Sequence, residues 1–328
     1  MSCSQKNKED GILYFIEEYL SLHINLKELT IKYLNPRADL TFKRIFGEHP
    51  DLVISLLNAL LPLKAGEEIR EIEYLPSEMV PDNPLRKFSI VDVRCCDVKG
   101  RQFLVEMQML WSPEFRERVL FNASKAYVRQ LDAGEGYELL QPVYSLNLVN
   151  EVFEPALDGY YHHYAMVHVE HTDHIIDGLQ LIFVELPKFT PHTYSEKRMH
   201  VLWLRFLTEI GESTRVVPHE LLEAPEISKA LTVLEESAFT DEELAGYEHF
   251  WDGISVEKTL YNSARREGLA EGRAEGKAEG IAEGRAEGLA EGEAKGKRLI
   301  AANMKKSGID PLIIVQCTGL SIEEIERL

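Results

Sequence analysis

The stretch FSIVDVRCCDVKGRQFLVEMQM, residues 88–109, decides the fold of this chain. Apolar and polar residues alternate along it, and a period of two is typical of β-strands. Val98-Lys99-Gly100 fits a three-residue hairpin loop, because such loops commonly end in a left-handed residue and glycine adopts that conformation without a steric penalty. A two-residue turn at Lys99-Gly100 would shift the register and turn the side chains of one strand to the other face. We therefore expect a β-hairpin whose register depends on this loop.

With the three-residue loop, Asp97 pairs with Arg101, and counting back along both strands pairs Asp92 with Glu106. Directly opposed residues share one face of the sheet, with Cβ atoms roughly 4.5–5.5 Å apart. The alternation predicts that one face is apolar, with Val91, Val93, Cys95, Phe103, Val105 and Met107. The other face is polar, with Asp92, Arg94, Glu106 and Gln108.

Two carboxylates opposed on one strand pair repel each other, and aspartate is poorly suited to strands. A divalent cation between Asp92 and Glu106 would turn this repulsion into a binding site. Mg²⁺ suits two carboxylates, because it prefers oxygen ligands and keeps several waters. The alternative is a solvated strand face that happens to be polar. The residues by themselves leave both interpretations open.

The remaining chain alternates between helical and strand patterns, which predicts an α/β fold. Helices are expected after Asn35-Pro36-Arg37, from Pro50 to about Leu61, and from a capping Ser112 with Pro113 at the first helical position to about Leu131. Further strands are expected at 142–149, 161–169 and 179–186. The expected organisation is an N-terminal helical appendage (1–34), an α/β core (35–190), a helical connector (191–262), a Gly/Ala/Glu repeat (263–300) and a small helical cap (301–328).

Glycine recurs at every fourth position from Gly268 to Gly296. Each interior glycine costs a helix about 1 kcal/mol relative to alanine, so a helix here would need a partner packed on its small-residue stripe. The alternative is a solvated spacer. In the cap, Ser321 and Glu324 form a capping box pattern. Acidic residues in its last helix favour a packing or dimerising cap over a DNA-reading helix, and we expect self-association through the repeat and the cap.

The composition is that of an ordinary globular protein, with 45% hydrophobic and 28% charged residues among 328. The net charge of -19 argues against DNA binding by the whole surface, although the acidic surplus lies mainly beyond residue 205. Four cysteines without a CxxC pair, and no histidine cluster at zinc spacing, indicate reduced thiols. No signal peptide or membrane-spanning stretch is evident, so a cytoplasmic location is expected.

Several motifs in this order resemble one known family: NPRADLTFKRIFGE at 35–48, SIVDVRC at 89–95, VEMQML at 105–110, RERVLFNASKAYVRQL at 116–131, GEGYELLQPVYSLNLV at 134–149 and LIFVELPKF at 181–189. Together with the repeat tail, they are similar to the recombination-promoting nuclease / putative transposase family. This family belongs to the PD-(D/E)xK restriction-endonuclease-like group. The resemblance implies a mixed sheet flanked by helices, with a metal site at one end of the sheet.

Carried over by position, the resemblance makes Asp92 and Glu106 the metal ligands and places Gln108 where the general pattern has lysine. Glutamine can orient a water or phosphate through hydrogen bonds, but it carries no positive charge. Asp39 resembles an upstream acid of the family, although an acid at a helix start is also stabilised by the helix dipole. The resemblance also implies substrate contacts from Arg118, Tyr127 and Gln130 on the helix that follows; alternatively, Tyr127 belongs to the core and Arg118 is a solvated surface charge.

A local basic surface is expected on the core segment, from Lys43, Arg44, Arg86, Lys87, Arg94, Arg101, Arg116, Arg118, Lys125 and Arg129. The function implied is that of an Mg²⁺-dependent DNA endonuclease that hydrolyses phosphodiester bonds and promotes recombination or transposition-like events. The alternative is a non-catalytic DNA-binding or assembly protein on a decayed nuclease fold. Cleavage of RNA is a third possibility that the residues leave open.

Overall fold

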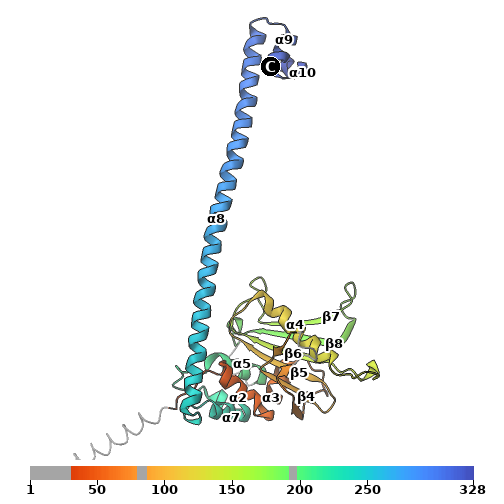
Figure 1. Ribbon diagram of the computed structural model, residues 1–328, viewed down its shortest axis with the longest axis vertical. Helices are drawn as coiled ribbons and strands as arrows, with labels where there is room; N and C mark the ends of the chain where they lie inside the picture. The colour runs from red at the N-terminus through yellow and green to blue at the C-terminus, as the bar shows by residue number, and fades with distance from the viewer. Residues whose placement is uncertain (1–30, 80–86, 192–197) are drawn as a thin grey trace, which may run out of the picture. The chain divides into compact units, whose positions relative to one another are not determined.

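The computed structural model describes residues 31–79, 87–191 and 198–328 (Figure 1). The expected appendage up to residue 30, and Arg86 of the expected basic surface, lie outside the described residues. The chain divides into two compact units, residues 1–255 and 256–328. The division falls within a single helix, so each unit is described by itself.

The first unit contains a mixed six-stranded sheet in the order β1-β4-β5-β6-β8-β7. β5, β6 and β8 run parallel to one another, and the other pairs are antiparallel. The strands of this sheet are β1 (Ile72–Tyr74), β4 (Val93–Asp97), β5 (Gln102–Gln108), β6 (Val143–Val149), β7 (Tyr161–Val167) and β8 (Ile175–Glu185). A separate two-stranded sheet pairs β2 (Glu78–Met79) with β3 (Ser89–Ile90). The mixed sheet confirms the expected α/β class.

The hairpin of β4 and β5 has the register that the sequence predicts. Cys95 pairs with Phe103 and Val93 with Val105, and the Asp97 N–H donates to the Arg101 carbonyl at 3.1 Å. Gly100 has φ +81, the left-handed conformation expected at the end of a three-residue loop. The three-residue loop is therefore confirmed.

Helices cover both faces of the sheet (Figure 1). The helices of the first unit are α2 (Asp39–Gly47), α3 (Pro50–Leu60), α4 (Pro113–Val128), α5 (Met199–Glu209), α6 (His219–Glu223), α7 (Pro225–Val233) and the first part of α8 (Asp241–Lys306). The apolar sides of α2, α3, α5 and α7 form one large core with the face of the sheet that carries Val93 and Val105. The opposite face, with Leu104, packs against α4. Ser112 and Pro113 begin α4 as expected, but the Ser112 side chain does not cap a backbone N–H of the helix.

The polar face of the hairpin is covered by α4, so the alternative of a solvated strand face does not hold. Because α4 lies over this face, Leu104 is fully buried and Glu106 is only 5% exposed. Val91 is also misplaced in the alternation: it precedes β4 and packs with Leu104 under α4, not with Val93 in the large core. β6 is buried along its whole length, as expected for a parallel strand covered on both faces.

The segment after residue 198 contributes to the large core as strongly as the sheet does. Trp203 in α5 is fully buried and donates its indole N–H to the Ser55 hydroxyl of α3 at 3.0 Å. Arg205, only 1% exposed, is paired with Glu209 at 2.8 Å. The large core therefore extends beyond residue 190 into the helices that follow.

The second unit consists of the remainder of α8, α9 (Pro311–Thr318) and α10 (Ile322–Glu326). The repeat is helical throughout, and nothing lies within 4 Å of the Cβ position of any of its glycines. The capping box of Ser321 and Glu324 is confirmed, and Ala301, Ile314 and Ile325 form a small core. No helix in the described parts of the chain is long and apolar enough to cross a membrane.

Candidate active site

The two predicted acids meet at one end of the β4–β5 hairpin. Asp92 directly precedes β4, and its carboxylate accepts the backbone N–H of Met107 at 2.7 Å. Extending the register of the hairpin by one pair places Asp92 opposite Glu106. The buried carboxylate of Glu106 accepts a hydrogen bond from the Asn122 amide of α4 at 3.1 Å. The hairpin therefore orients Asp92, and α4 orients Glu106.

Both carboxyl groups bind protons more tightly than usual. Burial raises the pKa of Asp92 to about 6, against the lowering effects of the Met107 hydrogen bond and of Lys43. Burial and the neighbouring Asp92 raise the pKa of Glu106 to about 7, although Arg118 and Asn122 act in the opposite direction. The positively charged groups around this pair therefore do not compensate for the burial of its two carboxylates.

The donor set fits a small, oxygen-preferring cation. Mg²⁺ is commonly bound through one or two carboxylates and completes its coordination with waters. A cation would stabilise the ionised form of both acids, which burial disfavours. Within the described residues, no group of three or more histidine, cysteine, aspartate or glutamate side chains is placed to hold a metal ion. The protein could therefore contribute two carboxylates here, with water or substrate oxygens filling the other positions.

Gln108 is connected to Glu106 through an arginine of α4. The Arg118 guanidinium donates to the Gln108 side-chain oxygen at 2.7 Å and lies 3.6 Å from a carboxylate oxygen of Glu106. Gln108 in turn donates its amide N–H to the Leu110 carbonyl at 2.5 Å. The Arg118 guanidinium also lies over the Phe115 ring, 4.8 Å from its centroid. A cation from a helix thus stands beside the strand position where the general pattern has lysine.

Asp39 lies at the solvent side of the same region. It is the first residue of α2, and its carboxylate forms an ion pair with Lys43 at 2.6 Å. Both side chains are more than 40% exposed. Their charges act on Asp92 in opposite directions, since Asp39 raises its pKa and Lys43 lowers it. The structure therefore brings Asp39 close enough to influence the pair electrostatically, without a direct contact.

Tyr127 and Gln130 are not brought to this site. Tyr127 lies in the last turn of α4 and Gln130 just after its end, and the nine residues from Arg118 to Tyr127 correspond to about 13 Å of helix. The Gln130 amide exchanges two hydrogen bonds of 2.9 Å with the backbone of Gln141, just before β6. Tyr127 packs partly buried against the cluster under α4, close to Gly178. Both contacts are typical of structural residues.

The expected basic surface is smaller than the sequence suggests, because several of its cations are held by the fold. Arg101 is buried in an ion pair with Asp97 at 2.7 Å. Arg44 lies over the Phe239 ring and pairs with Glu243, while Lys125 donates to the Met79 carbonyl. The side chains of Lys43, Arg116 and Arg118 remain at least 42% exposed. Lys43 and Arg118, which also act electrostatically on Asp92, are therefore the exposed cations near the two acids, whereas Arg116 is held by Glu154.

Asn122 is the site residue that the sequence analysis missed. Its side chain is fully buried, and its carbonyl oxygen has no hydrogen-bond partner in the described structure. Asn122 follows Phe115 and Val119 at the spacing of the buried face of α4. A polar amide at an apolar helical position could have drawn attention to it, because a buried polar group requires a partner.

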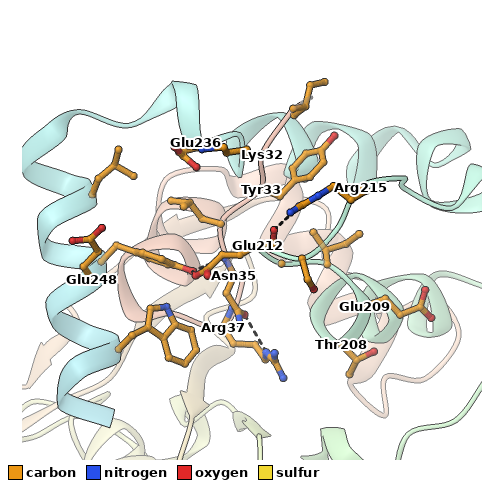
Figure 2. A pocket seen from close by; sticks show the side chains of 18 of the residues that line it. Lys32, Tyr33, Asn35, Arg37, Thr208, Glu209, Glu212, Arg215, Glu236 and Glu248 are labelled. Atoms are coloured by element: carbon orange, nitrogen blue, oxygen red, sulfur yellow. Dashed lines mark hydrogen bonds and ion pairs between the residues drawn. The ribbon is translucent and has the colours of Figure 1, made fainter. Parts of the chain in front are cut away.

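Other polar clusters lie away from the two acids. Glu185, at the end of β8, is fully buried and accepts hydrogen bonds from Lys188, His162, and the backbone N–H groups of Phe153 and Glu154 at 2.5–2.9 Å. A pocket of about 1090 Å³ lies near α5 and the beginning of α8 (Figure 2). Many of its polar groups contact one another: Lys32 pairs with Glu236, and Tyr247 donates to Glu212. This pocket contains neither Asp92 nor Glu106.

Comparison with known proteins identifies a family whose match includes the two acids. The family model described as "PD-(D/E)XK nuclease family transposase" matches residues 36–252, more than half of the chain. No curated protein and no solved structure matches. The matched range contains the mixed sheet, the helices on both of its faces, Asp92 and Glu106. This chain therefore belongs to the PD-(D/E)XK nuclease family transposases.

Proposed function

We propose that this protein is a divalent-metal-dependent endonuclease that hydrolyses phosphodiester bonds of DNA. The observation that carries the proposal is the pair formed by Asp92 and Glu106. The fold holds two carboxylates at one end of the hairpin, and burial raises the pKa of each. In its ionised form such an arrangement is unfavourable unless a cation neutralises it. Membership of a nuclease family adds a reaction class to this geometry.

In this proposal Asp92 and Glu106 hold Mg²⁺. The bound ion would lower the pKa of an attacking water and would provide positive charge to stabilise the scissile phosphate. The protein contributes the positions of the ligands: the Met107 N–H orients Asp92, and the Asn122 amide orients Glu106. Asp39 adds a carboxylate at the rim, which is paired with Lys43 and acts on Asp92 through its charge.

The proposed substrate is DNA, bound through exposed cations near the two acids. Lys43 and Arg118 are partly exposed and act electrostatically on Asp92. A phosphate at the metal would therefore lie within reach of positive charge, despite the net charge of -19. The role we propose is DNA breakage that promotes recombination or transposition-like events in the cytoplasm. Binding of DNA without cleavage would indicate a decayed nuclease.

The decisive experiment incubates supercoiled plasmid with the protein and Mg²⁺, with and without excess chelator. We expect nicked or linear product that appears only with free Mg²⁺ and is absent with Asp92→Ala. A parallel reaction with single-stranded RNA separates the two substrate classes. Full cleavage by Asp92→Ala, or equal cleavage in chelator, would exclude this metal site.

We further propose that the chain self-associates through the repeat and the cap. The repeat helix has no intramolecular neighbour at its glycines, and the cap core has three fully buried residues. So small a core is rarely sufficient by itself. Light scattering at micromolar concentration should show an oligomer for the full chain and a smaller assembly for a chain truncated after Asn262. A monomeric full-length protein would exclude this assembly.

A further inference from the structure

We infer that Arg118 supplies the positive charge which the E-x-Q form of the motif lacks, and that Gln108 positions its guanidinium. The inference rests on the proposed function and assigns roles within it. It turns Gln108 from a catalytic residue into a positioning residue. It also gives Arg118 a role in the reaction itself, beyond holding DNA.

The contacts of Gln108 indicate that its amide positions Arg118. Both polar atoms of its amide are used: the oxygen accepts from Arg118 at 2.7 Å, and the nitrogen donates to the Leu110 carbonyl at 2.5 Å. An amide held in this way has little freedom to orient a water or a phosphate. Its orientation instead presents an acceptor to the guanidinium.

The surroundings of Arg118 hold its guanidinium in place and leave it accessible. Its guanidinium lies 3.6 Å from the Glu106 carboxylate and 4.8 Å from the centre of the Phe115 ring. These contacts hold one side of the planar group, while 46% of the side chain remains exposed. Arginine has five N–H donors, so donors remain for a phosphate oxygen after these contacts are made.

The charge of Arg118 lies close to the place that the charge of a lysine at residue 108 could reach. A lysine at residue 108 would extend from the strand position now occupied by Gln108, and its ammonium group could reach the region of the Gln108–Arg118 contact. In this chain the charge comes from α4 instead of β5. Preorganised cations that face developing negative charge commonly contribute about 100- to 1000-fold to a rate.

The test measures single-turnover cleavage of plasmid at saturating DNA and Mg²⁺ by the full-length protein. We expect Arg118→Ala to lower the rate constant about 100-fold. Arg116→Ala is the matched control, since it removes an arginine of the same helix with similar exposure that pairs with Glu154 instead. Its rate constant should stay within about threefold, because screened surface ion pairs contribute little.

Two further variants separate charge from structure. Gln108→Lys in the Arg118→Ala background should recover at least about tenfold of the lost rate, since it returns a cation to the same place. Gln108→Ala should lower the rate about tenfold in the wild-type background and have little further effect in Arg118→Ala, because residues that act as a unit are not additive. Thermal unfolding of each variant shows that the fold is retained.

The outcomes distinguish this inference from the proposed function. If the wild-type protein leaves nucleic acid intact with Mg²⁺ and with Mn²⁺, the proposed function is overturned. If the wild type cleaves and Arg118→Ala cleaves at the same saturated rate, only the role of Arg118 is overturned. Weaker DNA binding with an unchanged saturated rate would make Arg118 a simple phosphate anchor and overturn the inference. Failure of Gln108→Lys to recover any activity would also overturn it.

Discussion

Glu106 and Glu185 are both buried glutamates near the ends of strands in the same sheet, yet their surroundings differ. Glu185 accepts hydrogen bonds from Lys188, His162 and two backbone N–H groups. Burial acts to raise its pKa, but these hydrogen bonds, led by that of Lys188, outweigh burial and lower it. For Glu106 burial and Asp92 prevail, and the pKa rises to about 7.

The difference separates a structural acid from a candidate metal ligand. The fold provides full compensation for the charge of Glu185, which joins β8 to the loop before β7. It leaves Glu106 and Asp92 with too little positive charge of their own. Burial alone is therefore not diagnostic of a site; incomplete compensation of a buried charge is the more informative feature.

The largest expected effect is the loss of cleavage in Glu106→Gln. This substitution keeps the size of the side chain and removes the charge that would hold Mg²⁺. We expect the rate of plasmid cleavage to fall at least about 1000-fold, equivalent to about 4 kcal/mol of transition-state stabilisation. Gel analysis of supercoiled plasmid measures it. Activity within tenfold of wild type would place Glu106 with Glu185 among the structural acids.

Glu185→Gln should lower the stability of the fold and leave Mg²⁺ binding unchanged. It leaves the Lys188 ammonium without its carboxylate partner, so we expect the free energy of unfolding to fall by about 3 kcal/mol. Urea unfolding followed by fluorescence measures this change. Calorimetric titration should show unaltered Mg²⁺ affinity for the folded fraction. A selective loss of Mg²⁺ binding without destabilisation would mean that Glu185 belongs to the metal site.

The pH dependence of stability should come from Asp92 and Glu106. Their raised pKa values mean that the folded protein binds more protons than the unfolded chain between about pH 4 and pH 7. Without metal, the stability they contribute is present at low pH and is lost as pH rises through about 6 and 7. The expected loss between pH 5 and pH 8 is on the order of 4 kcal/mol.

Added Mg²⁺ should reverse this loss at pH 8 and have little effect at pH 5, because it binds the ionised carboxylates. Cleavage should rise over the same interval. Urea unfolding at both pH values, with and without Mg²⁺, provides the measurement. The double variant Asp92→Asn, Glu106→Gln serves as the control and should lose most of the pH dependence. An unchanged slope in this variant would locate the titrating groups elsewhere.

The smallest effect is expected for Asp39→Asn. Asp39 raises the pKa of Asp92 without a direct contact, so its removal should shift the pH midpoint of cleavage slightly downward. At saturating Mg²⁺ the rate should fall less than about tenfold, since its exposed charge is screened by solvent. A pH–rate profile measures both. A loss as large as that of Glu106→Gln would instead make Asp39 a metal ligand.

The hairpin could be predicted from the sequence because its determinants are local. The last position of the three-residue loop is left-handed, which favours glycine, and Gly100 at this position places Asp92 opposite Glu106. Alternation then identifies which side chains share a face, and family resemblance adds the metal-binding role as a hypothesis. The capping box at Ser321 is predictable for the same reason, since its partners are three residues apart.

Tertiary structure alone decided how that hairpin is surrounded. The sequence pattern left open whether the polar face of the hairpin is solvated, and the structure shows that α4 covers it and buries Glu106. The contacts of Arg118 and Asn122 depend on where α4 crosses the sheet and how it is rotated about its axis. Gln130 follows the end of α4 and is held there, away from the acids, by Gln141. The identity and spacing of residues determine which side chains share a face, but the packing of helix on sheet determines which of them reach the acids and which charges are left uncompensated.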